Sequence, residues 1–441
     1  MRDWLFLWTS LGILALGCSA AGPEPELRLE APNLILISID TLRADHLGCY
    51  GYDRPTTPTL DRLCEDAVVF SEAIAHAPST LHSHASIFTS LIPHHHGAGW
   101  GGKTRLAEEA LTLAEVVQEA GMATAAFTGG GQMDRIFGLD QGFDSYEQPR
   151  AKHFYGIVKR AFQWLEERPD RPFFLFLHSY ETHHPYEPQP RFLELLETNY
   201  DGDLPDEISV ALLREINRKE RTLQDGDLEH IVNTYDAEIR SMDEGLKHLI
   251  TFLRENSLYD NTMIVFTSDH GEEFGEHGRI GWHSHSLYDE LLKVPLIVKF
   301  PKQEHSGTRV PDQVGSIDIA PTVLAALGLA TPEIFEGQDL SPLAAGADSV
   351  SRPVISRIDR ALGKNIDSIR RPGWKLYRAQ LFDLEADPEE IWDTALNKPR
   401  LVESMQAEIE TVVNSRKPYL GEQVVPEGKT LNELKALGYL R

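Results

Sequence analysis

Five short, almost purely apolar segments constrain the fold of this 441-residue chain more than any other feature of its sequence. They are Asn33–Asp40 (NLILISID), Thr124–Thr128 (TAAFT), Phe173–His178 (FFLFLH), Met263–His270 (MIVFTSDH) and Pro295–Phe300 (PLIVKF). Apolar runs of this length, separated by helical patterns, are typical of parallel strands that are buried on both faces. The sequence therefore predicts an α/β fold built around a central sheet.

Polar side chains stand at the carboxyl ends of several of these segments. Asp40, His178, Asp269 and His270 all occupy such positions, although they lie far apart in the sequence. Ligands of such sheets bind beyond the carboxyl ends of the strands, so we expect these residues to converge on one site. Carboxylates and imidazoles together suit a divalent ion, either Zn or Mn, or Ca if oxygen ligands dominate.

A hydroxyl residue opens a predicted helix close to this expected site. Thr80 precedes a helical stretch that runs through Ile87–Leu91. The positive end of a helix favours an anionic substrate, and coordination to a metal activates a hydroxyl that is otherwise a poor nucleophile. Taken alone, Thr80 would be interpreted as a helix cap, and Asp40 likewise. The prediction of a catalytic site depends on their combination with the histidine-rich segments 178–186 and 267–288.

The charge balance limits the partners of this protein. The chain has 42 Lys and Arg residues against 68 Asp and Glu residues, which gives a net charge of −26, and no basic cluster stands out. Nucleic acid is therefore not an expected partner. An acidic chain that binds an anionic substrate needs a local cation, and a metal ion is the simplest one.

The N-terminal residues are predicted to direct export. Residues 1–18 contain the apolar run Leu5–Gly17 after Arg2, which is too short to span a bilayer. The run ends in Ala-Leu-Gly-Cys-Ser, which resembles a bacterial lipoprotein signal with Cys18 as the lipidated residue; the alternative is a plain secretory signal. Residues 19–31 suit a tether. We expect a membrane-anchored lipoprotein that faces the periplasm or the cell exterior, with no membrane contact other than the lipid on Cys18.

Two regions follow the tether. Residues 32–350 are predicted to form one catalytic domain, which includes a long amphipathic helical stretch from Leu228 to Arg254. Residues 351–441 contain short apolar segments and Arg-rich turns, and they predict a small antiparallel sheet closed by one or two helices, with a short tail helix at Leu431–Arg441. Cys49 and Cys64 are interpreted either as two buried thiols or as one disulfide.

Several segments resemble the sulfatase family of the alkaline phosphatase superfamily, and together they extend over residues 32–395. They are PNLILISIDTLRADHLGCYGYDRPTTPTLDRL, SHASIFTSLIPHHHG, LTLAEVVQEAGMATAAF, GLDQGFDSY, SDHGEEFGEHG, HSLYDELLKVPLIV, SIDIAPTVLAALGL and LFDLEADPEE. The resemblance implies an alkaline-phosphatase-like three-layer sandwich with a mixed central sheet, followed by a subdomain built on a small C-terminal antiparallel sheet.

The resemblance also implies roles for individual residues. Asp40, Asp269 and His270 would bind one divalent metal ion (Ca, Mn or Zn). Thr80 occupies the position of the family's nucleophile, and it would also be a ligand of this ion.

Histidines complete the site that the resemblance implies. His183 lies in a segment similar to the family's D-P-H-x-P-Y, where it would contact the oxygens of the ester or protonate the leaving group. Either His283 or His285 lies where the family supplies a Lys or His to the same anionic group. Of these two residues, we favour His285.

The sequence departs from the pattern of sulfatases at several positions. The family's C-x-P-S-R, whose first residue is oxidised to formylglycine, is replaced by Thr80–His84, in which the Arg has become His84. Thr cannot undergo this oxidation. Thr41 replaces the second metal-binding Asp, and the Lys and His of the family's G-K-W-H-L-G fall on Gly129 and Gly131. Substrate binding would then depend on the metal and on the histidines.

These observations predict an exported, metal-dependent ester hydrolase with Thr80 as the nucleophile. Its substrate would be a phosphate mono- or diester, or a sulfate ester, on a small molecule, a glycan or a lipid. We favour phosphate, because Thr nucleophiles occur in superfamily members that resemble nucleotide pyrophosphatase/phosphodiesterases and phosphoethanolamine transferases. Three alternatives stay open: a sulfuric ester hydrolase without formylglycine, a phospho-group transferase, and a binding protein that has lost catalysis.

Overall fold

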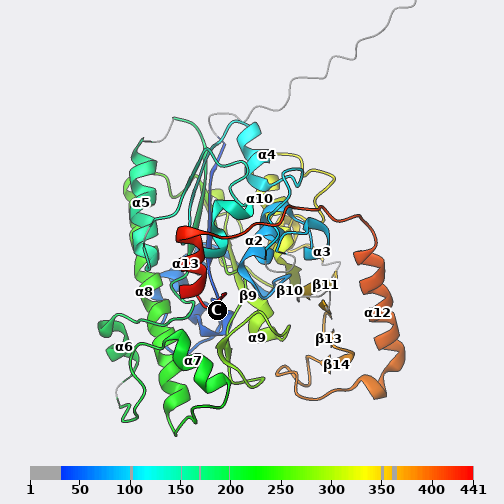
Figure 1. Ribbon diagram of the computed structural model, residues 1–441. Coiled ribbons are helices and arrows are strands. Elements are labelled where there is room, and N and C mark those ends of the chain that lie inside the picture. Colours follow the sequence, from blue (N-terminus) through cyan, green and yellow to red (C-terminus); the bar gives the residue numbers. More distant parts are fainter. Residues whose placement is uncertain are drawn as a thin grey trace, which may run out of the picture.

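The computed structural model describes residues 31–440, except 100–102, 150, 168–169, 198, 349–351 and 360–364. The predicted signal with Cys18 and the tether up to residue 30 lie outside the described residues. A sheet of eight strands occupies the centre of the molecule (Figure 1). In spatial order, its strands are β10 (Arg309–Gly315), β2 (Val68–Ile74), β9 (Lys293–Lys299), β6 (Thr262–Thr267), β1 (Asn33–Ile39), β5 (Phe173–Ser179), β3 (Ala123–Phe127) and β4 (Ser145–Glu147).

The direction of the strands confirms a mixed sheet. Strand β1 is parallel to both of its neighbours, β5 and β6, and β3 is parallel to β5. Strand β9 is antiparallel to β6 and β2, so the prediction that Pro295–Phe300 is a parallel strand is wrong. A strand that is buried on both faces has the same apolar pattern in either direction, so its sequence does not reveal which way it runs.

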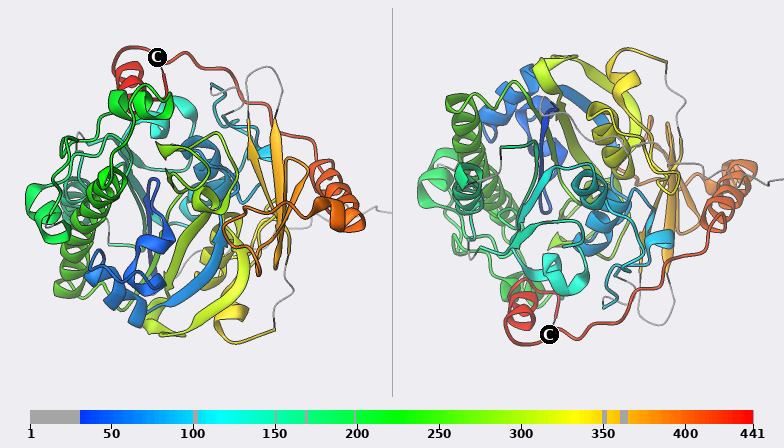
Figure 2. Two further views of the ribbon diagram at one scale, coloured as in Figure 1. Left: turned by 90° about the horizontal axis from the view of Figure 1, so that it is seen from below. Right: turned by 90° about the horizontal axis from the view of Figure 1, so that it is seen from above.

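The inner strands of the sheet contribute to two cores, whereas the edge strands β10 and β4 contribute to one. In β1, Leu34 and Leu36 join one hydrophobic cluster, whereas Ile35, Ile37 and Ile39 join the other. Because neighbouring side chains in a strand point to opposite faces, an apolar residue is needed at every position. Helices α2 (Thr80–Thr89), α4 (Leu113–Glu119) and α10 (Ile319–Ala326) cover the first face, and α1 (Pro58–Glu65), α5 (Phe154–Glu167) and α8 (Asp227–Glu255) cover the second (Figure 2).

Helix α8 corresponds to the long amphipathic stretch that the sequence predicts. A buried stripe with helical spacing runs along it, formed by Ile231, Tyr235, Ile239, Met242, Leu246, Leu249 and Leu253. Two acidic residues, Asp227 and Glu229, lie in its first turn, where they complement the positive end of the helix dipole.

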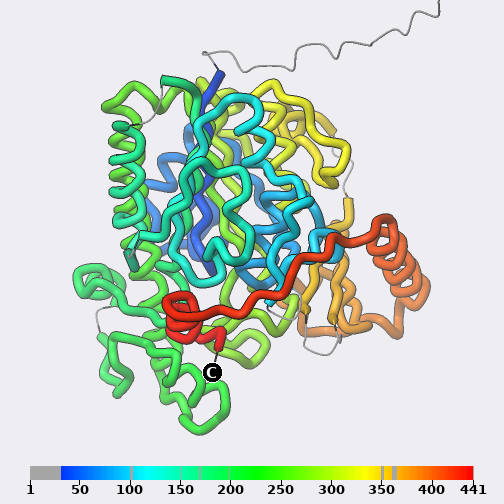
Figure 3. The backbone as a smooth tube through the Cα atoms, turned by 45° about the horizontal axis from the view of Figure 1, so that its top comes forward, coloured from blue at the N-terminus to red at the C-terminus, as the bar shows by residue number. Residues whose placement is uncertain are grey.

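A second, antiparallel sheet lies near the C-terminus, as the sequence predicts. Its strands are β11 (Val354–Ile358), β12 (Ile366–Arg371), β13 (Trp374–Tyr377) and β14 (Gln380–Asp383), paired in this order. Helix α12 (Pro399–Val413) packs on this sheet through the buried Met405. The chain then crosses back to the large domain and ends beyond α13 (Gly428–Ala436), which begins earlier than the predicted tail helix (Figure 3).

Short elements complete the described fold. They are α3 (Pro93–His96), α6 (Pro190–Leu196), α7 (Val210–Asn217), α9 (Asp289–Leu292), α11 (Ser341–Ala344) and the hairpin of β7 (Glu273–Phe274) and β8 (Ile280–Trp282).

Cys49 and Cys64 are free, buried thiols, and the pKa of Cys64 is raised by its hydrogen bond with Cys49 and by burial. Within the described residues, no helix has the length and apolar character that a membrane span requires.

Candidate active site

The candidate site lies at the carboxyl ends of three adjacent parallel strands. Asp40 directly follows β1, the segment 180–184 follows β5, and the segment 268–270 follows β6. The first residue of α2, Thr80, reaches the same place from the side. The strand-end residues named from the sequence therefore do converge, as expected from the arrangement of parallel strands.

Three buried ligand atoms meet at the centre of this site without a hydrogen-bond partner. They are Asp40 Oδ1, Asp269 Oδ2 and His270 Nε2. The imidazole nitrogen of His270 lies 3.5 Å from Asp269 Oδ2 and 4.0 Å from Asp40 Oδ1. Unsatisfied polar atoms are costly in a protein interior, and three ligand atoms that face one another suit the binding of a cation.

The atoms around this centre hold the three ligands in place. Asp269 Oδ1 accepts hydrogen bonds from the main-chain N–H groups of His270 (3.0 Å) and Thr41 (3.3 Å), which leaves Oδ2 free. His270 Nδ1 donates to the carbonyl of Gly271 at 2.9 Å, so its Nε2 carries the lone pair. Two carboxylate oxygens and one imidazole nitrogen fit a divalent metal ion.

The two carboxylates differ in their electrostatic surroundings. Burial, followed by the charge of Asp269, raises the pKa of Asp40. Burial alone would also raise the pKa of Asp269, but the neighbouring His270, His84 and His178 lower it. The pKa values of the two carboxylates are therefore shifted in opposite directions.

Thr80 is bonded to this carboxylate pair. Its hydroxyl donates to Asp40 Oδ2 at 3.0 Å, and His178 Nε2 lies 3.4 Å from the same oxygen. Thr80 is fully buried and belongs to the first turn of α2. A hydroxyl in this place lies beside the candidate metal ligands and at the positive end of a ten-residue helix.

A cluster of imidazoles forms the wall next to the candidate metal ligands. The ring of His283 lies 4.6 Å from that of His270 and 4.8 Å from that of His183. His183 Nε2 is buried without a partner. His283 Nδ1 lies 3.0 Å from Glu272, but burial outweighs this carboxylate and lowers the pKa of His283 to about 4. Two neutral imidazoles therefore face the centre of the site.

His285 lies differently from its neighbour two residues earlier. Its Nε2 forms an ion pair with Glu273 at 2.7 Å, and its Nδ1 lies 3.0 Å from the carbonyl oxygen of His283. Ser284, between the two histidines, has a left-handed backbone with φ of 63°. The chain therefore turns there, and the structure brings His283 rather than the favoured His285 into contact with His183 and His270.

Thr41 and His84, two of the departures from the sulfatase pattern, make hydrogen bonds that join the segments next to the site. The Thr41 hydroxyl donates to the carbonyl of Thr182 at 2.9 Å. His84 lies between the carbonyl of Thr80 (2.8 Å) and the hydroxyl of Ser38 (2.9 Å), and burial lowers its pKa. Both side chains join neighbouring segments of the fold, and His84 does not supply the fixed positive charge of an Arg.

Sequence reasoning missed two residues of the site. Glu272 bonds His283 and also lies 3.4 Å from His184, so it orients two rings of the histidine wall. Its place directly after Ser-Asp-His-Gly could have indicated this role. Tyr439 lies 2.8 Å from the Thr80 hydroxyl and comes from the C-terminal tail; the sequence holds no local signal for that contact.

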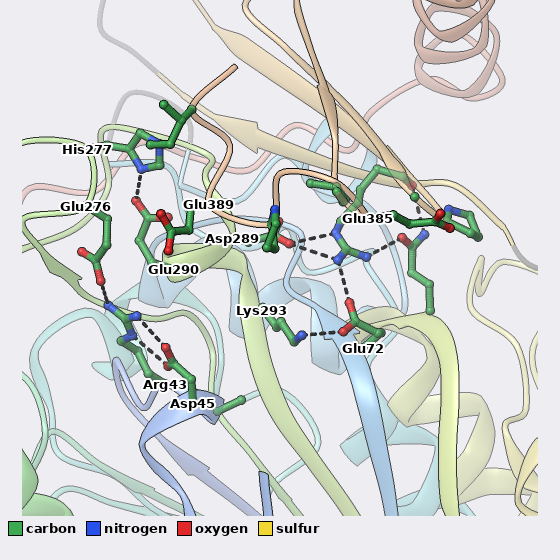
Figure 4. A pocket seen from close by; sticks show the side chains of 18 of the residues that line it. Arg43, Asp45, Glu72, Glu276, His277, Asp289, Glu290, Lys293, Glu385 and Glu389 are labelled. Atoms are coloured by element: carbon green, nitrogen blue, oxygen red, sulfur yellow. Dashed lines mark hydrogen bonds and ion pairs between the residues drawn. The ribbon is translucent and has the colours of Figure 1, made fainter. Parts of the chain in front are cut away.

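A separate cavity of about 750 Å³ lies between the two sheets (Figure 4). Most of its charged side chains are paired. Arg43 contacts Asp45 and Glu276, and Arg370 contacts Glu72. None of the candidate metal ligands and none of the histidines of the wall line this cavity, so it belongs to the contact between the large domain and the small sheet.

This fold, with carboxylates and imidazoles at its strand ends, is that of the alkaline phosphatase superfamily. The model of the sulfatase family matches residues 32–329, so the chain belongs to the sulfatase family. It is 23% identical to N-acetylglucosamine-6-O-sulfatase of Bacteroides thetaiotaomicron, over 85% of this chain and 84% of the relative. It is 26% identical to an ulvan-active sulfatase of Formosa agariphila, over 89% of this chain and 82% of the relative.

Solved structures agree with this fold. A structure described as a complex with its substrate D-glucosamine-2-N,6-O-disulfate superposes with a TM-score of 0.71 at 20% identity, over 88% of this chain and 99% of the other. The phosphonate monoester hydrolase of Agrobacterium radiobacter gives a TM-score of 0.70 at 19% identity, over 86% and 95% of the two chains. As a member of the sulfatase family, the protein is an ester-bond hydrolase.

Proposed function

We propose that this protein is an exported, metal-dependent hydrolase that attacks a phosphate ester with the hydroxyl of Thr80. One observation carries the proposal: the Thr80 hydroxyl donates to Asp40 beside three buried, unpartnered ligand atoms. The hydroxyl of Ser268 also lies near a candidate ligand, 3.4 Å from Asp269 Oδ1, but it makes a shorter hydrogen bond of 2.7 Å to the main-chain carbonyl of His270.

The ion would be held by Asp40, Asp269, His270 and Thr80. When bound, it would supply positive charge to the oxygens of the ester and favour the ionised form of the Thr80 hydroxyl. Three oxygens and a nitrogen in the donor set favour Zn or Mn over Ca, which takes six to eight oxygen ligands.

The side chains then carry out an in-line displacement. The Thr80 oxygen forms a bond to phosphorus while the bond from phosphorus to the leaving oxygen breaks, and the hydroxyl proton of Thr80 has Asp40 within reach. The leaving oxygen takes a proton from one imidazole of the histidine wall, His183 or His283, which would bind that proton when the negative charge of the ester lies beside it. In the second half of the reaction, water attacks the phosphorus of phospho-threonine and gives up a proton to the same imidazole. The bond from phosphorus to the Thr80 oxygen breaks, this oxygen takes its proton back from Asp40, and phosphate is released.

The choice of phosphate rests on the chemistry of Thr80. A formylglycine hydrate expels sulfate by collapse to the aldehyde, and a Thr ester has no such route. Hydrolysis of a sulfate ester without formylglycine is the second candidate, because curated relatives are named sulfatases. Since a structural neighbour is described with a disulfated glucosamine, we propose an anionic glycan as the body of the substrate. We also propose export, with a lipid on Cys18 as the anchor.

Turnover by wild type and two variants tests this function. Protein that lacks residues 1–18 is assayed with an aryl phosphate, a bis-aryl phosphate and an aryl sulfate in the presence of Mn, Zn or Ca. We expect phosphoester hydrolysis, a loss of about a thousandfold or more in Thr80→Ala, and partial activity in Thr80→Ser, which keeps a hydroxyl. Full turnover by Thr80→Ala would refute the role of Thr80. Turnover of the sulfate ester alone would establish the second candidate.

A further inference from the structure

The C-terminal tail returns from the small sheet to the candidate active site. After α12, its main chain runs beside the segment 103–105, with Arg105 N donating to the carbonyl of Glu422 (2.9 Å) and Val424 N donating to that of Lys103 (2.8 Å). Helix α13 and the last residues then lie at the edge of the large domain (Figure 3). The tail thus has a defined path that ends at the site.

The end of the tail is attached on one side of the site to the loop that contains the glycines 129–131. The Thr430 hydroxyl donates to Asp134 at 2.7 Å, and both of these groups are buried. The main-chain N–H of Gly131 donates to the carboxylate of Glu433 at 3.2 Å. These bonds place α13 over this glycine loop.

The other side of the tail is attached to the histidine wall and α7. His184 Nε2 lies 3.1 Å from the carbonyl oxygen of Leu437, and Arg214 donates to that of Gly438 at 3.2 Å. Residues 437–439 therefore bridge the entrance of the site from the glycine loop to the histidine wall.

This bridge delivers Tyr439 to the proposed nucleophile. The Tyr439 hydroxyl lies 2.8 Å from Thr80 Oγ1, and its ring lies 5.4 Å from that of His183 and 6.0 Å from that of His283. Because the Thr80 hydroxyl directs its own proton to Asp40 (3.0 Å), the proton between Tyr439 and Thr80 belongs to Tyr439. Tyr439 is then the donor to the attacking oxygen.

The tail packs against the glycine loop at positions where the loop has no side chains. A Cβ atom on Gly130 would lie 2.6 Å from the Glu433 carboxylate, and one on Gly131 would lie 2.7 Å from the Leu437 side chain. Both distances are shorter than atoms tolerate. The same loop aligns with the family segment that carries a Lys and a His, which fall here on Gly129 and Gly131. The tail therefore fills the space beside Gly131, whereas the ring of Tyr180 fills the space beside Gly129.

We propose that Tyr439 is a catalytic residue of this enzyme: its hydroxyl donates to Thr80 Oγ1 before attack and to an oxygen of the bound phosphoryl group after it. This inference rests on the proposed function and adds to it a donor that the tail supplies in place of the cations absent from the glycine loop. The hydroxyl gives up no proton in this role, so the step adds no further bond change to the displacement.

Two quantities measured on Mn-loaded protein test the role of Tyr439. They are kcat with an aryl phosphate and the Kd for inorganic phosphate from calorimetry, which does not depend on turnover. In Tyr439→Phe, the ring stays and only the hydroxyl is lost; we expect kcat to fall and the Kd to rise, each by about tenfold to a hundredfold, as for a hydrogen bond to a charged group. Tyr419→Phe, a change in the same tail at a residue bonded to His95, is the control and should leave both unchanged.

A chain that ends at Glu427 removes the whole bridge and is the second variant. We expect its kcat and its affinity for phosphate to be no higher than those of Tyr439→Phe. An increase of kcat in either variant would show that the tail only covers the site and would overturn the proposal. An unchanged kcat or an unchanged Kd in Tyr439→Phe would overturn it as well. If wild type bound phosphate but hydrolysed no ester, the proposed function would be refuted, and the catalytic role of Tyr439 with it. In that case the Kd values of wild type and Tyr439→Phe would still show whether the Tyr439 hydroxyl contacts phosphate.

Discussion

Replacing Asp269 by Asn separates the ligand role of this residue from its structural role. Its Oδ1 accepts hydrogen bonds from the main-chain N–H groups of His270 and Thr41, and the amide oxygen of Asn can accept both. Its Oδ2 has no partner, and there Asn would place an NH₂ group, which cannot bind a cation. We therefore expect Asp269→Asn to fold normally and to lose the metal.

The size of the effect follows from binding linkage. A metal at a hundred times its Kd stabilises the folded state by about 2.7 kcal/mol. For a chain of 441 residues, the unfolding entropy is about 0.9 kcal/mol per kelvin, so the wild-type Tm should rise by about 3 °C. In Asp269→Asn, the rise should vanish. The metal-free variant should be no more stable than metal-free wild type, because the lowered pKa of Asp269 means that its neighbouring histidines stabilise its charge in the folded state.

Calorimetry after dialysis against a chelator measures both effects, with and without Mn or Zn. Asp201→Asn changes an exposed residue of the same type and should keep the full wild-type rise. If Asp269→Asn showed the same rise in Tm as wild type, this carboxylate would not be a ligand. A wild type with no rise for any divalent ion would refute the metal site itself.

The remaining predictions concern the histidine wall, a buried ion pair and pH. His283→Ala should lower kcat/KM by about a hundredfold or more, and His285→Ala by less than tenfold, because His283 faces the site. In urea unfolding, Lys375→Met should cost about 3 to 5 kcal/mol, since its two carboxylate partners stay buried, whereas Lys293→Met at a more exposed pair should cost about 1 kcal/mol or less. Burial lowers the pKa of His76 to about 4, below its unfolded value of about 6.5, so the unfolded state takes up the proton first and stability falls as pH drops from 6.5 to 4. His76→Asn keeps a donor for the main-chain carbonyl that His76 contacts and should weaken this pH dependence by about one proton.

Much of the central sheet could be predicted because its strands are buried on both faces. The unbroken apolar runs at β1, β5 and β6 were visible in the sequence, and their polar ends converge because the strands are parallel neighbours. Strand β2 was not predicted, because Ser71 and Glu72 interrupt its apolar pattern, and neither was β10, which contains Asp312. The direction of β9 depends on how the strands are connected, and it cannot be predicted from the residues of the strand itself.

The site was harder to predict where the path of the chain decides the contacts. His283 and His285 are equivalent in a sequence, and it is the left-handed turn at Ser284 that sends them to different neighbours. Tyr439 stands 359 residues after Thr80, and their contact depends on the return of the tail across the molecule. Neither feature follows from the periodicity or composition of the segments concerned.

A trapped covalent intermediate tests the central claim most directly. Metal-loaded wild type is mixed with a large excess of aryl phosphate and quenched in acid within a turnover, and the peptide that contains Thr80 is analysed by mass spectrometry. We expect this peptide to gain the mass of one phosphoryl group on Thr80. If Thr80 stayed unmodified at every quench time while turnover continued, and if turnover were undiminished in Thr80→Ala, Thr80 would not be the nucleophile.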